Sequence, residues 1–333
     1  MELQRNTVLR KIHNCTPEAI AFLDEWYNES EYVIAHTSGS TGAPRPIKLL
    51  KNDMRISAMS TNRYFNITQS SKLLCPLSAN YIAGKMMIVR AIIVGAELWM
   101  EHPSNTPVFN DYGNIDLIAV VPSQVQHLLS NSLIVDNIRN VLIGGAQLPS
   151  KLIKQIVKSG MTAYVSYGMT ETCSHVALRK VDSTYSEQYE AMHDINFGID
   201  NRGCLVICSK SRSFRELFTN DIVEIIDNRH FVWKGRIDNV INSGGIKVYP
   251  EEIEQLIQHV IPDGIEFYIS KTTDEKWGEV PVLVISKAVT NVLQLLKDAR
   301  KCVKMNAQRP VKILVRSIEH TSSGKIIRKL SCE

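Results

Sequence analysis

The run LIAVV at residues 117–121 decides the fold, because it passes directly into a helical pattern. Pro122 follows and suits the first turn of a helix. Val125, Leu128 and Leu129 then recur on one helical face. A buried strand followed at once by an amphipathic helix is the repeating unit of a parallel sheet.

The same alternation continues downstream. Residues 141–143 read VLI and are closed by Gly144 and Gly145, Pro149 opens a second amphipathic helix, and residues 162–166 read TAYVS. This strand–helix–strand–helix–strand order predicts an α/β fold with a parallel sheet covered by helices. Ligands in such sheets usually bind beyond the carboxyl ends of the strands.

The pattern changes near residue 235. Before it, residues 221–226 and 230–233 predict an antiparallel hairpin. After it, helices from Pro250 and over 292–303 alternate with strands at 265–270, 280–285 and 311–315, which is an α+β pattern. We therefore expect a large N-terminal domain over 1–235 and a small C-terminal domain over 240–333, joined at 236–239.

Composition limits the class of protein. The 333 residues are 44% apolar and 22% charged, as in a globular chain of about two domains. A net charge of +4 is too weak to indicate nucleic acid as a partner. No apolar signal core or bilayer-length run occurs, so we expect a cytoplasmic protein without membrane insertion. The seven cysteines are scattered, and reduced thiols are a better interpretation than a zinc pair at Cys204 and Cys208.

The segment TSGSTGAPR at 37–45 alternates hydroxyls and glycines directly after an apolar run. Such a loop can turn tightly and direct backbone N–H groups and hydroxyls at one anion, which suits a polyphosphate. Taken alone, a segment of this composition is more often an ordinary loop. A P-loop is excluded because it needs Gly-Lys-Ser/Thr, and the chain offers only GKM at 84–86 and GKI at 324–326.

Four further segments carry chemically useful side chains. SYGMTET at 166–172 combines a tyrosine face, hydroxyls and a carboxylate that suits Mg²⁺. TND at 219–221 places an acid where it could hold a ribose diol. The other two are GRIDNVINSGGIKVYPEEIE at 235–254 and TSSGKIIR at 321–328.

These five segments, in this order, resemble the adenylate-forming superfamily of acyl- and aryl-CoA ligases, peptide-synthetase adenylation domains and luciferases. The resemblance covers Thr37 to Arg328. It implies that a carboxylate attacks the α-phosphate of Mg·ATP, giving an acyl-adenylate and pyrophosphate, and that a thiol, usually of CoA, then displaces AMP. Such chemistry depends on charge neutralisation and positioning.

The resemblance also implies residue roles. Thr170 would contact the α-phosphate and Glu171 the Mg²⁺ ion, and Lys325 would bridge the substrate carboxylate and the α-phosphate. The small domain would be a mobile lid that turns about Asp238 between the two half-reactions. Ser243, Gly244 and Gly245 would line the CoA channel. The residues implied for ATP are Thr37, Ser38, Gly39, Ser40, Thr41, Gly42, Arg45, Gly144, Gly145, Tyr167, Gly168, Asp221 and Arg236.

The chain departs from the family pattern in a few places. Arg45 replaces the usual lysine of the phosphate loop, Asn220 stands where glycine is common, and His320 stands where proline is frequent. The phosphate loop begins at residue 37, whereas most relatives carry a long region before it. We therefore expect an N-terminal domain that is shortened at its start, with a differently built acyl pocket.

Arg90 gives an indication of which carboxylic acid is the substrate. It lies in the apolar segment 82–94, where a guanidinium needs a partner. An internal ion pair or a snorkelling side chain would satisfy it, and so would a second carboxylate on the substrate. Segments 76–90 and 170–176 are most similar to the o-succinylbenzoate–CoA ligases of menaquinone synthesis, whose acid keeps a free carboxylate. Ser174 and His175 are weaker candidates for the same pocket, and Lys85 is expected in solvent.

Other functions remain open. An adenylation enzyme could load a carrier-protein thiol, or another aryl or acyl acid could be the substrate. A truncated protein that only binds nucleotide is disfavoured by the intact motif residues, and a nucleic-acid-binding protein by the lack of a basic cluster outside the tail. A homo-oligomer is compatible with the sequence.

Overall fold

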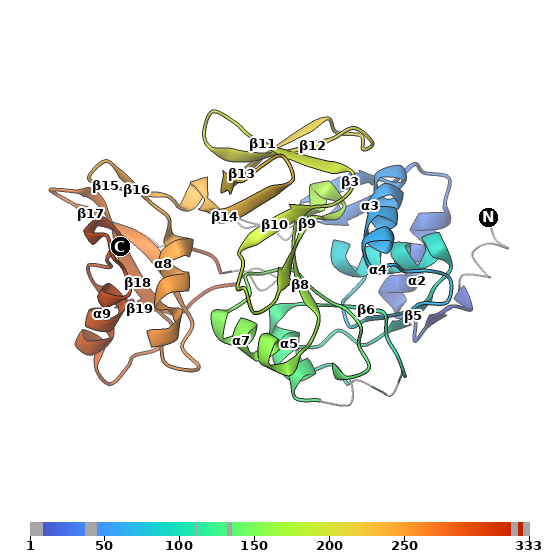
Figure 1. Cartoon of the computed structure of the whole chain (residues 1–333), viewed down its shortest axis with the longest axis horizontal. Helices are drawn as coiled ribbons and strands as arrows, with labels where there is room; N and C mark the ends of the chain where they lie inside the picture. Colours follow the sequence, from blue (N-terminus) through green and yellow to red (C-terminus); the bar gives the residue numbers. More distant parts are fainter. Residues whose placement is uncertain are drawn as a thin grey trace.

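The computed structural model describes residues 9–36, 45–108, 110, 112–131, 135–320 and 326–328. Its elements form a large body up to Arg236 and a smaller body that begins at Ile241 and carries the orange and red colours of Figure 1. The connection between them is the short 3-10 helix η2 (Ile237–Asn239).

Twelve strands of the described residues form one mixed sheet in the large body. The parallel half has the order β1-β5-β4-β6-β7-β8. Its strands are β1 (Ile12–His13), β4 (Lys72–Cys75), β5 (Glu97–Met100), β6 (Leu117–Val120), β7 (Val141–Ile143) and β8 (Ala163–Met169). The predicted unit, β6 to β8 with a helix in each connection, is confirmed as three neighbouring parallel strands.

The other half of the sheet is antiparallel. From β8 it continues in the order β9-β10-β14-β13-β12-β11. These strands are β9 (Ser174–Val181), β10 (Gln188–Ala191), β11 (Ile195–Ile199), β12 (Cys204–Ser209), β13 (Glu216–Ile225) and β14 (His230–Arg236). β13 and β14 are the predicted hairpin, and β13 begins five residues earlier than the expected start at residue 221.

Helices cover both faces of the parallel half. In β4, Leu73 belongs to the core that contains α4, whereas its neighbour Leu74 belongs to the core that contains α5 and α7, as expected for alternating side chains of a strand. The first face carries α2 (Pro17–Tyr27), α3 (Lys51–Tyr64) and α4 (Ile82–Val94); the second carries α5 (Pro122–Leu129) and α7 (Ser150–Ser159). Figure 1 shows the two groups on opposite sides of β6.

The small body has the predicted α+β pattern. Its sheet has the order β16-β15-β18-β17, with β19 beside β18. The elements are β15 (Ile241–Ser243), β16 (Ile246–Val248), α8 (Pro250–Ile257), η3 (Gln258–Val260), β17 (Phe267–Asp274), β18 (Gly278–Ile285), α9 (Val292–Lys301) and β19 (Ile313–Val315). The apolar faces of α8 and α9 pack into one core with β17 and β18. The predicted fold class, α/β with a small α+β body, is therefore confirmed.

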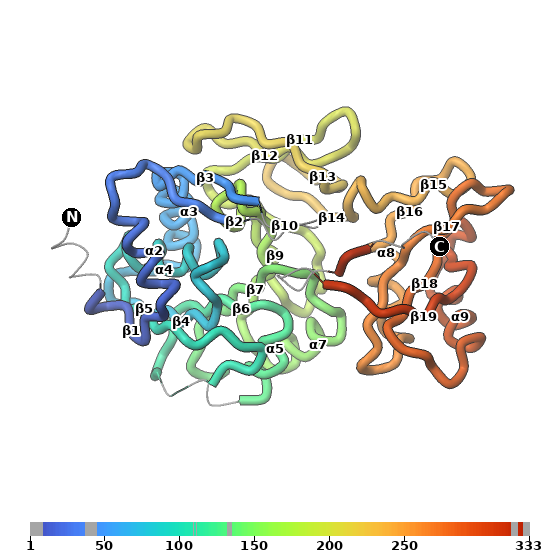
Figure 2. Tube along the Cα trace, turned by 180° about the vertical axis from the view of Figure 1, so that it is seen from behind, coloured from blue at the N-terminus to red at the C-terminus, as the bar shows by residue number. Residues whose placement is uncertain are grey.

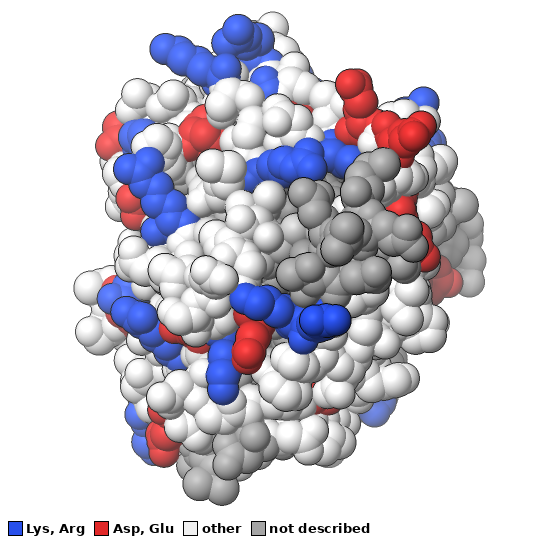
Figure 3. Space-filling model, turned by 90° about the vertical axis from the view of Figure 1, so that its right-hand side faces the viewer, with Lys and Arg blue, Asp and Glu red and all other residues white. Residues whose placement is uncertain are grey.

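Charged side chains of both signs are mixed on one face of the protein. On the face shown in Figure 3, Lys and Arg side chains lie in separate groups with Asp and Glu between them. No helix among the described residues is long and apolar enough to cross a membrane.

Candidate active site

The predicted phosphate loop starts and ends at two paired strands. β2 (Tyr32–His36) and β3 (Pro46–Leu50) run antiparallel, with His36 opposite Pro46, and Arg45 directly precedes β3. The pairing brings the two flanks of the loop together. The remaining predicted residues of the loop lie outside the described residues: Thr37, Ser38, Gly39, Ser40, Thr41 and Gly42.

Gly168 lets β8 and β9 approach each other closely. A Cβ atom at this position would lie 2.3 Å from the Ser174 carbonyl oxygen and 2.6 Å from the His175 Cα. The register of the two strands shifts here. The chain then turns through the 3-10 helix η1 (Thr170–Thr172), where Glu171 is exposed and Thr170 is half-buried. Both predicted ligand groups are thus open to an incoming molecule.

Asp221 is the centre of the predicted ribose site. Its carboxylate accepts a hydrogen bond from the Tyr167 hydroxyl at 2.7 Å and one from the Trp233 indole N–H at 3.2 Å. Arg236 Nη1 lies 3.7 Å away. Burial, followed by the charge of Asp221, raises the pKa of Tyr167 well above its usual range, so the phenol stays a donor. The structure therefore brings Tyr167, 54 residues upstream of Asp221, to the carboxylate that Trp233 and Arg236 also approach.

Asp238 lies in η2, between the two sheets. Its carboxylate accepts hydrogen bonds from Arg236 Nη2 at 2.8 Å and from Asn220 Nδ2 at 3.3 Å. Its side chain is half exposed. The expected hinge residue is thus tied to β13 and β14 of the large body.

Gly144 and Gly145 follow the end of β7. A Cβ atom on Gly144 would approach the Ser166 hydroxyl to 2.8 Å, and Gly145 has a φ of +91°. Ser166 donates a hydrogen bond to the Ile143 carbonyl oxygen at 3.0 Å. A side chain at the first position would therefore displace the Ser166 hydroxyl, and the backbone at the second position favours glycine. The exposed backbone here lies at the carboxyl end of a parallel strand, where ligands usually bind.

Ser243, Gly244 and Gly245 form the tip of the β15–β16 hairpin. Gly244 donates its N–H to the Trp277 carbonyl oxygen at 2.8 Å. A Cβ on Gly244 would lie 2.5 Å from the Trp277 ring. Figures 1 and 2 place this hairpin at the outer end of the small body, away from β8. The structure does not bring these three residues to the other candidate residues.

The side of the small body that faces the large one carries α8 and η3. Lys151 Nζ lies 2.8 Å from the Asp263 carboxylate, and the Ser150 N–H donates to Gln258 Oε1 at 2.7 Å. Figure 2 shows the red tail running from the small body toward the large one. Lys325, expected in this tail, lies outside the described residues, whereas Arg328 pairs with Glu254 of α8 at 2.7 Å.

Arg90 lies in α4 and is only 1% exposed. Its Nη2 donates to Ser174 Oγ at 2.9 Å and its Nη1 to Met87 Sδ at 3.4 Å, and Nε has no hydrogen-bond partner among the described residues. Burial lowers the pKa of Arg90 to about 10, so the group keeps its charge at neutral pH. Among the described residues, this buried cation is satisfied only by uncharged partners.

His175 is linked to Arg90 through Ser174. Ser174 Oγ lies 3.3 Å from His175 Nδ1, and His175 Nε2 lies 3.1 Å from Thr61 Oγ1. Burial, then the charges of Arg90 and Arg212, lower the pKa of His175 well below its usual range. Ser174 is partly exposed while His175 is buried, so of the two only Ser174 borders solvent.

The expectation for Lys85 is wrong. Its side chain is buried in α4, with Nζ 3.7 Å from Glu25 Oε2 and 4.6 Å from the Phe22 ring centroid. An acid and an aromatic face from α2 satisfy the ammonium inside the protein. Both partners lie about sixty residues upstream, so nothing local in the sequence indicates them.

Three contributors were missed from the sequence. Trp233 was assigned only to a strand, Thr61 lies in a helix rich in polar residues, and Arg212 lies in a polar loop. The Trp233 side chain faces Asp221, and a strand aromatic three residues before Arg236 is the one signal that could have indicated it. Thr61 and Arg212 gave no such signal.

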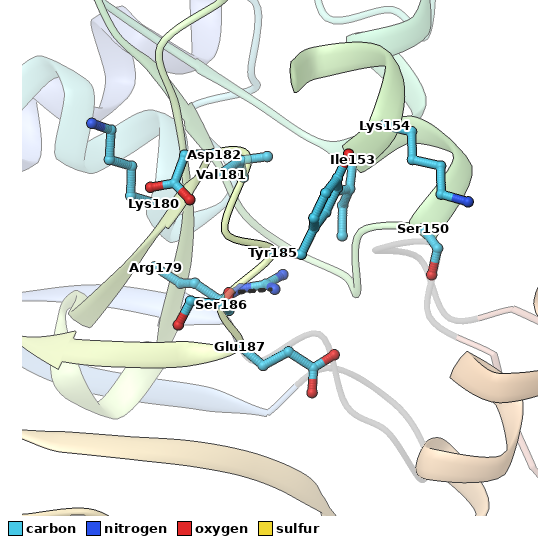
Figure 4. A pocket seen from close by; sticks show the side chains of 10 residues that line it. All are labelled: Ser150, Ile153, Lys154, Arg179, Lys180, Val181, Asp182, Tyr185, Ser186 and Glu187. Atoms are coloured by element: carbon cyan, nitrogen blue, oxygen red, sulfur yellow. Dashed lines mark hydrogen bonds between the residues drawn. The ribbon is translucent and has the colours of Figure 1, made fainter. Parts of the chain in front are cut away.

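A small cavity lies apart from these residues. It has a volume of about 110 Å³ and lies between α7 and the turn after β9. Figure 4 shows Lys154 and Ser150 on the helix, with Arg179 and Glu187 on the strand side. The volume is enough for only a few water molecules, and none of the predicted site residues lines it.

A family model described as "AMP-binding enzyme" matches residues 14–193, which is more than half of the chain. The chain is also 36% identical to a solved structure from Dyadobacter fermentans, described as an acyl-CoA synthetase (AMP-forming)/AMP-acid ligase II-like protein. That match covers 93% of this chain and 91% of the other, with a TM-score of 0.63.

Curated relatives share a name. The 2-succinylbenzoate--CoA ligase of Oceanobacillus iheyensis is 26% identical, over 80% of this chain and 62% of its own length. The enzyme of that name from Listeria monocytogenes serotype 4b is 27% identical, over 93% and 72%. The o-succinylbenzoate CoA synthetase of Bacillus subtilis, solved with an acyl-adenylate intermediate, matches in fold with a TM-score of 0.76 at 23% identity, over 89% of this chain and 67% of the other. The chain thus spans less than three quarters of each of these three relatives.

Proposed function

This chain belongs to the family of AMP-binding enzymes, and on that premise we propose that it is an ATP-dependent acid–CoA ligase acting on succinylbenzoate. A carboxylate oxygen of the acid attacks the α-phosphorus of ATP, and pyrophosphate leaves. The thiol of CoA then attacks the acyl carbon, and AMP leaves. The observation that carries the choice of acid is Arg90, a buried cation with no carboxylate partner among the described residues.

Asp221 is proposed to bind the ribose of ATP. Its two protein donors fix the carboxylate, and its remaining lone pairs can accept the two ribose hydroxyls. Arg236 lies near enough to limit the repulsion between this carboxylate and the phosphates. Tyr167, Gly144 and Gly145 are proposed to border the adenine, because they lie at the ends of the adjacent strands β8 and β7.

The phosphates are proposed to lie between the β2–β3 loop and η1. Glu171 would hold Mg²⁺, which commonly uses one or two carboxylates together with substrate phosphates, and the Thr170 hydroxyl would contact the α-phosphate. The exposed carboxylate of Glu171 fits that donor set. When bound, the ion neutralises phosphate charge. Arg45, at the end of the loop, adds a forked cation where a lysine is usual.

The small domain, over 240–333, is proposed to serve the two half-reactions in turn. In the first, Lys325 neutralises both the attacking carboxylate and the α-phosphate, and the Arg328–Glu254 pair anchors the segment behind it. In the second, a rotation at Asp238 carries the Ser243–Gly245 turn toward the thioester site. The absence of side chains on Gly244 and Gly245 would leave room for the slim pantetheine arm of CoA.

Arg90 is proposed to bind the carboxylate of succinylbenzoate that is not activated. Ser174 borders solvent and accepts from the guanidinium, so the acid meets Ser174 first and Arg90 through it. In a buried setting an ion pair gains more than it does in water. An acid with one carboxylate would leave the cation uncompensated.

We also propose that the enzyme works in the cytoplasm. The cysteines that the structure describes are all free thiols, which a reducing compartment maintains.

The test is product analysis with purified protein, Mg·ATP, CoA and a panel of aryl and dicarboxylic acids. Release of AMP together with the CoA thioester of succinylbenzoate is expected. Absence of AMP with every acid would contradict the ligase function. Accumulation of acyl-adenylate without transfer to CoA would instead favour a carrier-protein thiol as the acceptor.

Lys325→Ala separates the half-reactions. It should abolish formation of the acyl-adenylate, because two anions would meet without a neutralising cation. Thioester formation from supplied acyl-adenylate should persist, since the lysine acts in the first conformation only. Equal loss of both half-reactions would contradict the two-conformation proposal.

A further inference from the structure

Four side chains form a continuous chain of contacts behind the proposed acid site. Arg90 Nη2 lies 2.9 Å from Ser174 Oγ, Ser174 Oγ lies 3.3 Å from His175 Nδ1, and His175 Nε2 lies 3.1 Å from Thr61 Oγ1. They come from α4, β9 and α3, which lie side by side in Figure 1. The chain links the cation in α4 to Thr61 in the neighbouring helix α3.

The bond from Thr61 to the Ser57 carbonyl oxygen favours one direction for the hydrogen atoms of this chain. Thr61 Oγ1 donates to the Ser57 carbonyl oxygen at 3.0 Å, and with its one hydrogen in that bond it accepts from His175 Nε2. The Nε2 atom therefore carries the ring proton and Nδ1 is an acceptor. The hydroxyl of Ser174 donates to Nδ1 and receives the N–H of Arg90. The order of donation is Arg90 to Ser174 to His175 to Thr61.

The chain satisfies Arg90 without neutralising it. A neutral imidazole accepts a hydrogen bond but adds no negative charge, whereas a carboxylate in its place would form an internal ion pair with the guanidinium. The lowered pKa of His175 agrees with a neutral ring, because burial and the charges of two arginines disfavour a second cation there. The full charge of Arg90 thus remains for a ligand.

The backbone at Cys173 and Ser174 adopts an unusual conformation that neighbouring side chains fix. Cys173 and Ser174 have φ angles of 57° and 137°, both unusual for side chains other than glycine. The Thr172 hydroxyl lies 2.6 Å from the Ser174 carbonyl oxygen, and Asn62 Nδ2 donates to the Arg90 carbonyl oxygen at 2.9 Å. Strain that is fixed by surrounding contacts is a feature of functional sites.

We propose that His175 is a positioning residue for substrate choice: as the neutral Nε2–H tautomer, it orients Ser174 and Arg90 toward the second carboxylate of the acid. It does not touch the acid itself. The proposal rests on the proposed function for its substrate, but the tautomer is a property of the protein alone.

The tautomer is tested first. Heteronuclear NMR of the full chain with isotope-labelled histidine should show one ring that stays neutral and Nε2-protonated from neutral pH down to about pH 5, well below where free histidine titrates. The His175→Asn variant assigns this signal by its loss. A ring that is protonated on Nδ1, or that titrates like an exposed histidine, would overturn the proposal whatever the substrate proves to be.

Substrate choice is tested with a matched pair. His175→Asn and His175→Asp differ only in charge, and either side chain can accept from Ser174. The readout is the kcat/KM for succinylbenzoate divided by that for the matched acid without the second carboxylate. The ratio should fall at least tenfold more in His175→Asp, whose anion neutralises Arg90, than in His175→Asn; tenfold corresponds to about 1.4 kcal/mol.

The ratio of the two kcat/KM values also distinguishes a folding defect from a loss of substrate choice. A poorly folded variant loses activity on both acids and leaves the ratio unchanged, and His175→Leu, which lacks any acceptor, should lower it about tenfold. Equal ratios in His175→Asn and His175→Asp would overturn the positioning role. A wild-type protein that forms no AMP with succinylbenzoate would contradict the proposed function instead, and the NMR result would still decide the tautomer.

Discussion

Arg90 and Arg212 are both buried in the large body, at 1% and 5% exposure, yet their partners differ in kind. Arg212 Nε lies 2.6 Å from Asp194 Oδ2, and its Nη1 donates to the Thr172 carbonyl oxygen at 2.6 Å. Arg90 meets a hydroxyl and a thioether, with Nε left without a partner among the described residues. The charge of Arg212 is compensated within the fold, and that of Arg90 is not.

This difference separates a structural arginine from one kept for a ligand. An uncompensated buried charge lowers the stability of a protein, so it persists where another function requires it. Arg212 fastens Thr172, and with it the turn that presents Thr170 and Glu171. Arg90 is proposed to serve the acid through Ser174.

Arg212→Met should reduce stability more than any other change considered. It leaves the Asp194 carboxylate, whose side chain is 10% exposed, without its cation. We expect the free energy of unfolding to fall by about 3–5 kcal/mol, measured by urea denaturation. Adding Asp194→Asn should restore part of the loss. A decrease below about 1 kcal/mol would remove the structural role of Arg212.

Arg90→Met makes the same substitution at the other arginine. Since no carboxylate of the described residues loses its partner, the free energy of unfolding should change by no more than about 1 kcal/mol. The KM for succinylbenzoate should rise by roughly two orders of magnitude, because the second carboxylate loses its cation. Destabilisation equal to that of Arg212→Met would show that Arg90 is structural as well.

The buried His175, whose pKa is lowered by Arg90 and Arg212, predicts an effect of pH on stability. The folded state keeps His175 unprotonated, since burial, Arg90 and Arg212 lower its pKa, whereas the unfolded chain binds a proton below about pH 6.5. The unfolded state then holds more protons, so stability falls as the pH drops. The wild type should lose up to about 1.4 kcal/mol per pH unit more than His175→Asn. Parallel curves for the two proteins would contradict a neutral buried ring.

Lys85 is a third buried cation, and its substitution is expected to have the smallest effect on stability and on KM. Its partner Glu25 is 26% exposed and also accepts the Ile34 N–H at 2.5 Å, so it remains solvated and bonded without the lysine. Lys85→Met should therefore change the free energy of unfolding by about 1 kcal/mol or less. Its KM for succinylbenzoate should match that of the wild type. A rise in that KM would mean that α4 offers a second cation to the acid.

The same contrast shows what the sequence could predict. The alternation of apolar strands and amphipathic helices indicated the β6–β8 unit, and an arginine inside the apolar segment 82–94 indicated a missing partner. The direct partner, Ser174, lies 84 residues away, and Thr61 lies 114 residues from His175. Contacts of this separation depend on strand pairing across β8 and β9, which local patterns do not specify.

The prediction that Lys85 lies in solvent was wrong for the same reason, because its partners Glu25 and Phe22 lie on another helix. The antiparallel half of the sheet was indicated at its β13–β14 hairpin and at residues 204–208, whose pattern is that of a strand and which form most of β12. The family motifs indicated Asp221 and Arg236, and the fold brought Tyr167 and Trp233 to the same carboxylate.

The most direct measurement compares kcat/KM for succinylbenzoate with that for the matched acid lacking the second carboxylate, in wild type and in Arg90→Met. If Arg90 is kept unpaired for that carboxylate, the wild type prefers succinylbenzoate and the preference falls by roughly a hundredfold in the variant. A preference that is the same in both proteins would contradict this role of Arg90.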